Sequence, residues 1–301
     1  MAKNYIRFDW AIKKLLRNKA NFKVLEGLIE SLLNKKMTIK NILESEGNKQ
    51  EEEDKSNRVD LLCEDEAGDI FLFEIQTESE TAFHQRMLYG TSKIITEYIS
   101  SGQGYDMVRK VYSINIIYFQ FGNSKDYVFH GKTEFRGLHD NSEILEATPF
   151  QKKKFSIENV SDIYPEYYII KANDFDRWSV NSLDQWIYVL SNSEIPDNAT
   201  APGLKEAREV LDYDKLSAEE KASYYRHIKN NLVSRDNIDT AHEEGRAEGR
   251  AEGREEGRAE GREEGRMEEK LRNAKIMKEK GYPIHEIAEI SGLSISDIET
   301  I

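Results

Sequence analysis

Apolar residues recur every three to four positions along the first part of the chain, and this spacing predicts a helix over residues 9–33. A polar run over residues 18–21 can divide it into two helices. The same spacing predicts a second helical region over residues 81–101, which Gly102 is placed to end. Each region carries its apolar residues on one face, as a helix packed on a core does.

Strands are predicted where branched and aromatic residues gather in short runs. Gly68 suits a tight hairpin turn between two of these runs. The like-charged run 51–56 cannot bury itself and is expected to form a solvated loop. The predicted order is helix, three strands, helix, strand, which is an αβββαβ core of the α/β class with a mixed sheet. The predicted strands cover residues 38–43, 58–64, 70–76 and 111–119, and residues 125–150 can add one or two more.

The rest of the chain divides by composition into three parts. Residues 151–242 are predicted to be a mainly helical extension of a core that covers residues 1–150. Residues 243–270 contain Glu-Gly-Arg units that recur every four residues. Residues 271–301 have an apolar pattern of their own that resembles a helix-turn-helix.

The repeat over residues 243–270 has two interpretations. On a helix, four-residue spacing stacks like charges one turn apart, which is unfavourable, and each interior glycine costs about 1 kcal/mol relative to alanine. The segment is therefore expected to be a solvated, partly helical linker. In the alternative, the Arg stripe of one copy meets the Glu stripe of another while the glycine stripe allows close approach, which predicts a homo-oligomer through this segment.

The tail leaves two roles open. Its last predicted helix follows Ser294, which suits an N-terminal cap. In a DNA-binding helix-turn-helix this would be the recognition helix, yet it carries Asp297 and Glu299 and no Lys or Arg. A DNA-reading unit and a small helical docking unit are both compatible with this pattern.

Composition limits the classes of protein. The 301 residues are enough to bury a substantial core. The sequence contains no uninterrupted run of about 18 apolar residues, so no membrane-spanning helix is predicted. The first residues lack the apolar region of a secretory signal, and Cys63 is the only cysteine, so a cytoplasmic location is expected. The net charge of −13 is concentrated, because residues 44–54 and 243–269 each carry −5. The remaining −3 neither demands nor excludes a DNA partner.

Polar residues interrupt the otherwise apolar run 70–76. Glu74 and Gln76 project from one face of the predicted strand, about 7 Å apart, and pairing across the hairpin can bring Asp60 near Glu74. Two converging carboxylates repel each other unless a cation lies between them. With the main-chain carbonyl of Ile75 they would form half of an Mg²⁺ shell, and Mn²⁺ suits the same oxygen ligands. The alternative is that these polar groups face solvent at the end of a half-exposed strand.

Seven short motifs follow one another in the first half of the chain. They are Phe8-Asp9-Trp10-Ala11-Ile12-Lys13-Lys14-Leu15, Val59-Asp60-Leu61-Leu62, Phe73-Glu74-Ile75-Gln76, Phe83-His84-Gln85-Arg86-Met87-Leu88-Tyr89-Gly90, Gly104-Tyr105-Asp106, Val111-Tyr112-Ser113-Ile114-Asn115 and Phe135-Arg136-Gly137-Leu138-His139. In this order they resemble the PD-(D/E)XK nuclease superfamily. The resemblance is closest to the Rpn family of recombination-promoting nucleases, also described as PD-(D/E)XK family transposases, and it covers about residues 5–145 well.

The resemblance implies a restriction-endonuclease-like fold and a metal-dependent enzyme that cuts DNA, linked to recombination or transposition. It implies that Asp60 and Glu74 bind the metal and that Gln76 stands where the superfamily has a lysine. A lysine stabilises negative charge that develops on the phosphate or the nucleophile. Glutamine can orient a water and donate a hydrogen bond, but it carries no charge. The identity of the general base therefore stays open.

Further candidates each have a structural alternative. Glu26 can bring an acidic group from the first helix to the metal, or it can lie on a solvated face. Arg86 and Tyr89, one turn apart on the following helix, can face the substrate phosphates or serve the fold alone. Asp9 is expected to cap the first helix rather than to bind a ligand.

Two functions follow from the sequence. The first is a metal-dependent endonuclease that acts on DNA with Mg²⁺ or Mn²⁺. The second is a non-catalytic interaction protein that keeps a nuclease-like fold as its scaffold and acts through the repeat and the tail.

Overall fold

The computed structural model describes residues 5–43, 60–98, 104–173, 175 and 178–301. Contacts divide the chain into two compact units, Met1–Asn231 and Leu232–Ile301. The charged run predicted to be a loop at 51–56 and the predicted helix end at Gly102 lie outside the described residues.

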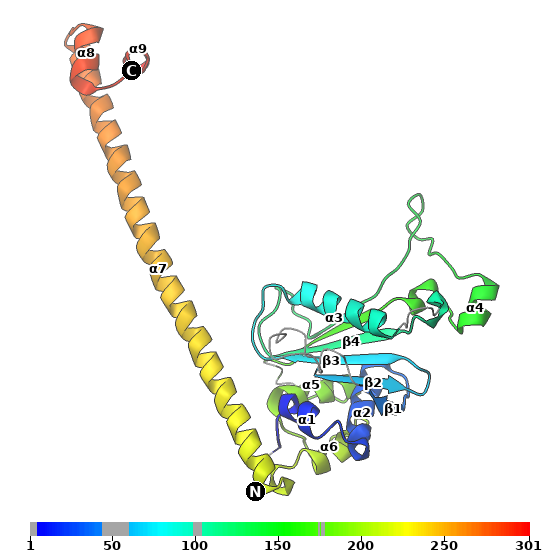
Figure 1. Ribbon diagram of the computed structural model, residues 1–301. Helices are drawn as coiled ribbons and strands as arrows, with labels where there is room; N and C mark the ends of the chain where they lie inside the picture. The colour runs from blue at the N-terminus through cyan, green and yellow to red at the C-terminus, as the bar shows by residue number, and fades with distance from the viewer. Residues whose placement is uncertain (1–4, 44–59, 99–103, 174, 176–177) are drawn as a thin grey trace. The chain divides into compact units, whose positions relative to one another are not determined.

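A six-stranded mixed sheet forms the centre of the first unit, in the order β1-β2-β3-β4-β6-β5 (Figure 1). The β3, β4 and β6 strands run parallel to one another, and the other neighbouring pairs are antiparallel. Gly68 has a φ of +89° in the β2–β3 hairpin, a conformation that glycine adopts without steric cost. The strands are β1 (Ile39–Ile42), β2 (Leu61–Asp65), β3 (Ile70–Gln76), β4 (Val111–Ile117), β5 (Val128–Gly131) and β6 (Glu166–Lys171).

Both faces of β3 are covered, by different helices (Figure 1). Phe71 and Phe73 pack into the main core with four helices, and Leu72, on the opposite face, packs with Ile94 of helix α3. A strand buried on both sides reads as a continuous apolar run, and alternation places Glu74 and Gln76 on the α3 face. The helices are α1 (Phe8–Lys14), α2 (Phe22–Leu33), α5 (Ser182–Asn192) and α6 (Leu204–Val210) on one side and α3 (Phe83–Glu97) on the other.

The predicted break in the first helical region is confirmed. Helix α1 ends at Lys14, and a 3₁₀ turn over Lys19–Asn21 leads into α2. Gly27 lies where α2 meets the segment before α6. A Cβ there would lie 2.2 Å from the Pro202 carbonyl oxygen, so this close approach requires glycine. The predicted αβββαβ order is confirmed as well.

The segment expected to be mainly helical after residue 150 also contributes an interior strand of the sheet. Helix α4 (Pro149–Phe155) is followed by β6, which lies between β4 and β5 in the sheet. In β6 the buried residues Tyr168 and Ile170 alternate with more exposed ones. Six such residues are too few for periodicity alone to distinguish a strand from a short helix. The sheet is therefore incomplete at residue 150.

Asp9 does not occupy the cap position expected for it, although its Oδ1 accepts a 2.9 Å hydrogen bond from the Trp10 N–H in the first turn. The cap position belongs to Arg7, whose side chain makes no capping bond, and Asp9 lies inside the first turn with 2% of its surface exposed. Its carboxylate accepts hydrogen bonds from Arg7 at 3.0 Å, from His227 at 3.1 Å and from Asn231 at 3.3 Å. Asp9 thus ties α1 to the first turns of α7 (Ala218–Glu279).

In the second unit, the repeat continues the 62-residue helix α7, and every residue from 241 to 270 is exposed. The continuous helix differs from the partly helical linker that the sequence favoured. Among the described residues, no helix combines the length and the apolar composition that a membrane span requires.

The tail forms the predicted helix-turn-helix-like unit. The end of α7, α8 (Ile284–Ser291) and α9 (Ile295–Thr300) share a cluster built on Ala274, Ile287, Leu293 and Ile298. Gly292 has a φ of +67° at the end of α8, and Ser294 caps α9 in a capping box.

Candidate metal centre

The β2–β3 hairpin brings Asp60 to the end of β3. Leu61 pairs with Phe73, so the register continues to place Asp60 beside Glu74. The Asp60 Oδ2 atom accepts a 2.6 Å hydrogen bond from the Ile75 N–H. The structure therefore brings together the two carboxylates that the sequence paired.

Glu74 is a buried carboxyl group with 8% of its surface exposed. Burial, helped by the charges of Asp60 and Glu80 and opposed by the Arg86 guanidinium, raises the pKa of Glu74 to about 7. Without a bound cation this carboxyl is protonated in part of the molecules at neutral pH. A divalent ion would favour its charged form, because opposite charge stabilises a carboxylate.

A side-chain cation already lies on Asp60. Lys13 of α1 places its Nζ 2.9 Å from Asp60 Oδ1, and Arg17 Nη2 donates to the Asp60 carbonyl oxygen at 2.7 Å. The Asp60 side chain is 12% exposed, whereas the Lys13 side chain is 47% exposed, so only the carboxylate side of this pair is shielded from solvent. Sequence reasoning missed Lys13 and Arg17, because about 45 residues separate them from Asp60 and no spacing rule connects them.

Gln76 is held by Arg86 of α3. Arg86 Nη1 donates to Gln76 Oε1 at 3.2 Å and to Glu80 Oε2 at 2.9 Å. Arg86 Nε is buried and has no hydrogen-bond partner among the described residues. The sequence identified Arg86 but missed Glu80, which lies in the connection between β3 and α3 and carries no motif of its own.

Two further residues shape the space around Glu74. Asn115 lies beside Glu74 in the β3–β4 register and is fully buried. Its Nδ2 donates to Ser113 Oγ at 2.9 Å and to the Tyr168 carbonyl oxygen at 3.3 Å, whereas its Oδ1 has no partner in the part of the chain that the structure describes. On α3, a Cβ at Gly90 would lie 3.6 Å from Glu74 Oε1, so the glycine leaves room over that carboxylate.

Two other predicted site residues are Glu26 and Tyr89. Glu26 makes its contacts elsewhere in the fold, and Tyr89 is mainly exposed. Glu26 is buried, accepts a 2.9 Å hydrogen bond from the Ile39 N–H and pairs with Lys23 at 2.9 Å. Glu26 thus accepts the hydrogen bond of the first backbone N–H of β1. Tyr89 lies on α3 with 57% of its surface exposed. Cys63 is fully buried in the main core.

The residues fit a hard divalent cation that keeps several waters. Asp60 and Glu74 offer carboxylate oxygens, and Asn115 Oδ1 is a buried acceptor beside them that needs a donor. The Ile75 N–H points to Asp60. The N–H and C=O groups of one strand residue point to the same side, so the Ile75 carbonyl also points to the side on which Asp60 lies. In the described chain, no group of three or more His, Cys, Asp and Glu side chains is arranged to hold a metal. The shell would therefore depend on the carbonyl and on water.

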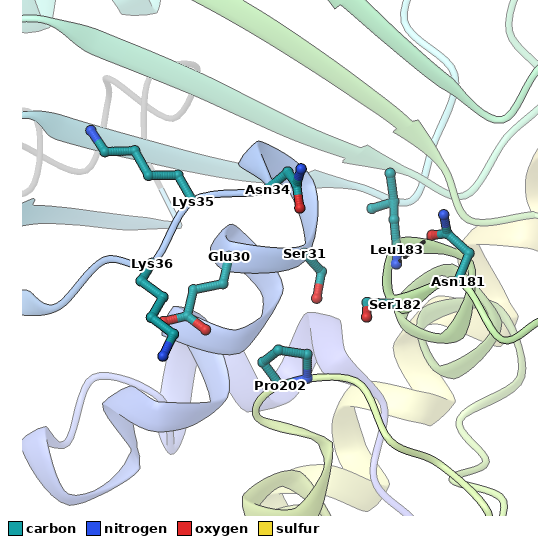
Figure 2. A pocket seen from close by; sticks show the side chains of 9 residues that line it. All are labelled: Glu30, Ser31, Asn34, Lys35, Lys36, Asn181, Ser182, Leu183 and Pro202. Carbon is teal, nitrogen blue, oxygen red and sulfur yellow. Dashed lines mark hydrogen bonds between the residues drawn. The ribbon is translucent and has the colours of Figure 1, made fainter.

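Two cavities lie apart from these residues. A cavity of about 470 Å³ lies between the end of α2 and the start of α5, and Figure 2 shows Lys35 extending away from Asn181 and Ser182. The Asn181 side chain already accepts from the first N–H groups of α5, so they are not free for an anion. The second, of about 810 Å³, is lined by Gly68 and other residues at the opposite end of β3. Neither is lined by Asp60, Glu74, Gln76 or Arg86.

The profile of a family described as PD-(D/E)XK nuclease family transposase matches residues 6–241. A comparison with curated proteins gives no match, and a comparison with solved structures gives none either. The matched range contains the whole six-stranded sheet and each residue of the carboxylate site.

Proposed function

Because the chain belongs to the PD-(D/E)XK nuclease family of transposases, we propose that it is a metal-dependent endonuclease that hydrolyses phosphodiester bonds in DNA. The observation that supports this most is the carboxylate pair, in which a buried Glu74 lies beside an Asp60 that already attracts a cation. Promotion of recombination or transposition is the setting that the family suggests for this activity.

In the proposed reaction, Asp60, Glu74 and the carbonyl of Ile75 would hold Mg²⁺ or Mn²⁺. The ion would supply charge stabilisation and lower the pKa of a water. Gln76 accepts from Arg86 through Oε1, which leaves its Nε2 as a donor that can orient the attacking water. Tyr89 lies exposed one turn beyond Arg86 and would contact the DNA backbone.

A plasmid-nicking assay with Mg²⁺ or Mn²⁺ tests this function. Asp60→Ala and Glu74→Ala should each lower the nicking rate at least about 100-fold, because the ion contributes several kcal/mol of charge stabilisation. Glu64→Gln is the matched control, since Glu64 lies on the same hairpin but pairs with Lys40 and Arg109. Cleavage that survives both alanine substitutions would rule out this site. Absence of cleavage by the unaltered protein with either metal would favour an interaction protein.

The repeat helix supports a second role, self-association, which is compatible with either function. In each repeat unit Arg follows Gly and Glu precedes it, so the two charges flank the glycine stripe at about 100° on opposite sides. Two parallel copies with facing glycines place Arg beside Glu, whereas two antiparallel copies place Arg beside Arg. The charges therefore favour a parallel pair of this chain, crossing at the angle typical of i, i+4 rows.

Light scattering on the full chain tests this pairing. Replacing all six Arg of the repeat by Glu should abolish association, while replacing the same six by Lys should preserve it. A single cysteine at Gly265 should form a disulfide-linked dimer if the copies are parallel and in register, and one at Met267, on another side of the helix, should not. Cys63 is buried and does not interfere. Association that survives the Glu substitutions would exclude the repeat as the contact.

A further inference from the structure

We infer that Arg86 is the catalytic cation of this site, reaching from α3 to the place that a lysine at position 76 would occupy, and that it contacts the scissile phosphate. The inference rests on the proposed nuclease function. It adds an assignment that the hairpin motif does not contain, because the charge comes from a different element of the fold.

The contacts of Arg86 carry this inference. Its Nη1 lies 3.2 Å from Gln76 Oε1, so a guanidinium charge lies within one hydrogen bond of residue 76. The same nitrogen bonds Glu80 at 2.9 Å, which fixes the side of the guanidinium that faces the hairpin. The Arg86 side chain is 25% exposed, so part of it is open to a substrate, while its Nε is buried.

The Nε atom of the guanidinium lacks an acceptor within the described part of the chain. It is buried there and makes no hydrogen bond with a described residue, and a buried donor without a partner is costly. The Nε side of a guanidinium presents two donors that match the oxygens of a phosphate. A phosphate of the DNA backbone would supply the missing acceptor and place the positive charge on the group where negative charge develops.

The same geometry explains why residue 76 is Gln. A lysine there would bring its ammonium close to the Arg86 guanidinium, and two like charges in a partly buried site repel each other. Glutamine instead offers an acceptor oxygen that orients Arg86. Lys13 is the rival cation, but its Nζ contacts Asp60 Oδ1 rather than residue 76.

A double-mutant cycle between positions 76 and 86 tests the assignment. In single-turnover cleavage with Mg²⁺, Arg86→Met should lower the rate about 100- to 1,000-fold, as loss of a charge-stabilising donor does, and Arg86→Lys should lower it less. Gln76→Lys should slow the enzyme while Arg86 is present. The same substitution should speed the Arg86→Met variant at least about tenfold. Lys13→Met is the matched control, because Gln76→Lys should not rescue it.

DNA binding gives a readout independent of turnover. The affinity of the full chain for a short labelled duplex, measured by anisotropy with Ca²⁺ at several salt concentrations, should lose about one unit of salt slope in Arg86→Met and regain it with Gln76→Lys. Thermal unfolding of each variant shows that it is folded.

The possible failures are distinguishable. Cleavage by Arg86→Met at the unaltered rate, or a double variant no faster than Arg86→Met, would overturn the assignment while the Asp60 and Glu74 site stands. No cleavage by the unaltered protein with Mg²⁺ or Mn²⁺ would overturn the proposed function. In that case an unchanged salt slope in Arg86→Met would also remove Arg86 as a phosphate contact.

Discussion

The charged groups around β3 and those of the repeat helix are organised in opposite ways. Near β3 the charges are individually partnered, Asp60 by Lys13 and Arg86 by Glu80, and Asp60 and Arg86 have only 12% and 25% of their side chains exposed. Along residues 241–270 every side chain is exposed, and like charges recur one helical turn apart. The same residue types therefore occur in two physically different settings within one chain.

This difference decides what a charged residue can reveal. A buried polar group costs free energy unless something satisfies it, so its presence within an apolar strand needs a reason. An exposed ion pair contributes little to stability, so the presence of a single exposed charge needs no particular reason. A single buried residue, Glu74, therefore indicates function. In the repeat, only the arrangement of many charges does so.

The largest effect on stability is expected from removal of Asp9, a buried and hydrogen-bonded carboxylate of the first unit. Burial raises the pKa of Asp9, but hydrogen bonds from His227 and Arg7 outweigh it and hold the pKa below the ordinary value of 3.8. Asp9→Ala should lower the free energy of unfolding by about 3–5 kcal/mol at neutral pH, since it leaves Arg7 without its carboxylate. The stabilisation by Asp9 is present above pH 3.8 and is lost as the pH falls through the lowered pKa. Urea unfolding at several pH values measures this, and a change below about 1 kcal/mol at pH 7 would contradict it.

The next effect should have the opposite sign. Glu74 has its pKa raised from 4.5 to about 7, so the folded state binds more protons than the unfolded state between these values and stability falls as the pH rises. In metal-free buffer, Glu74→Gln should therefore stabilise the protein by up to about 3 kcal/mol at pH 8 and hardly at all at pH 4. For comparison, hydrogen bonds from Arg109 and Lys40 outweigh burial and lower the pKa of Glu64, so Glu64→Gln should not stabilise at pH 8. Equal stability of the Glu74→Gln and unaltered proteins at both pH values would refute this.

The smallest effect is expected in the repeat. A Cβ at Gly257 would meet no atom within 4 Å, so Gly257→Ala should stabilise α7 locally by about 1 kcal/mol through helix propensity alone. Slower amide hydrogen exchange around residue 257 measures this gain. Gly27→Ala is the contrasting variant, because its Cβ would clash with the backbone at Pro202 and should destabilise the first unit. Unchanged exchange in Gly257→Ala would show that the repeat is not helical in solution.

Much of the fold could be predicted because local patterns specify it. Three-to-four spacing marked α1 to α3, apolar runs marked β1 to β4, and Ser294 marked the start of α9. Strand β6 was missed because its six residues carry too little pattern. Asp9 was misassigned because a carboxylate at a helix start suits a cap, and its partners His227 and Asn231 lie more than 200 residues away.

The sequence by itself determined that Asp60, Glu74 and Gln76 share a hairpin, since strand alternation and a short turn are local properties. Only the tertiary structure decided what surrounds them. Lys13 comes from α1, Arg86 from α3 and Asn115 from β4, and each meets the hairpin through packing between elements. Burial, which sets the pKa of Glu74, likewise belongs to the assembled sheet and its covering helices rather than to any stretch of sequence.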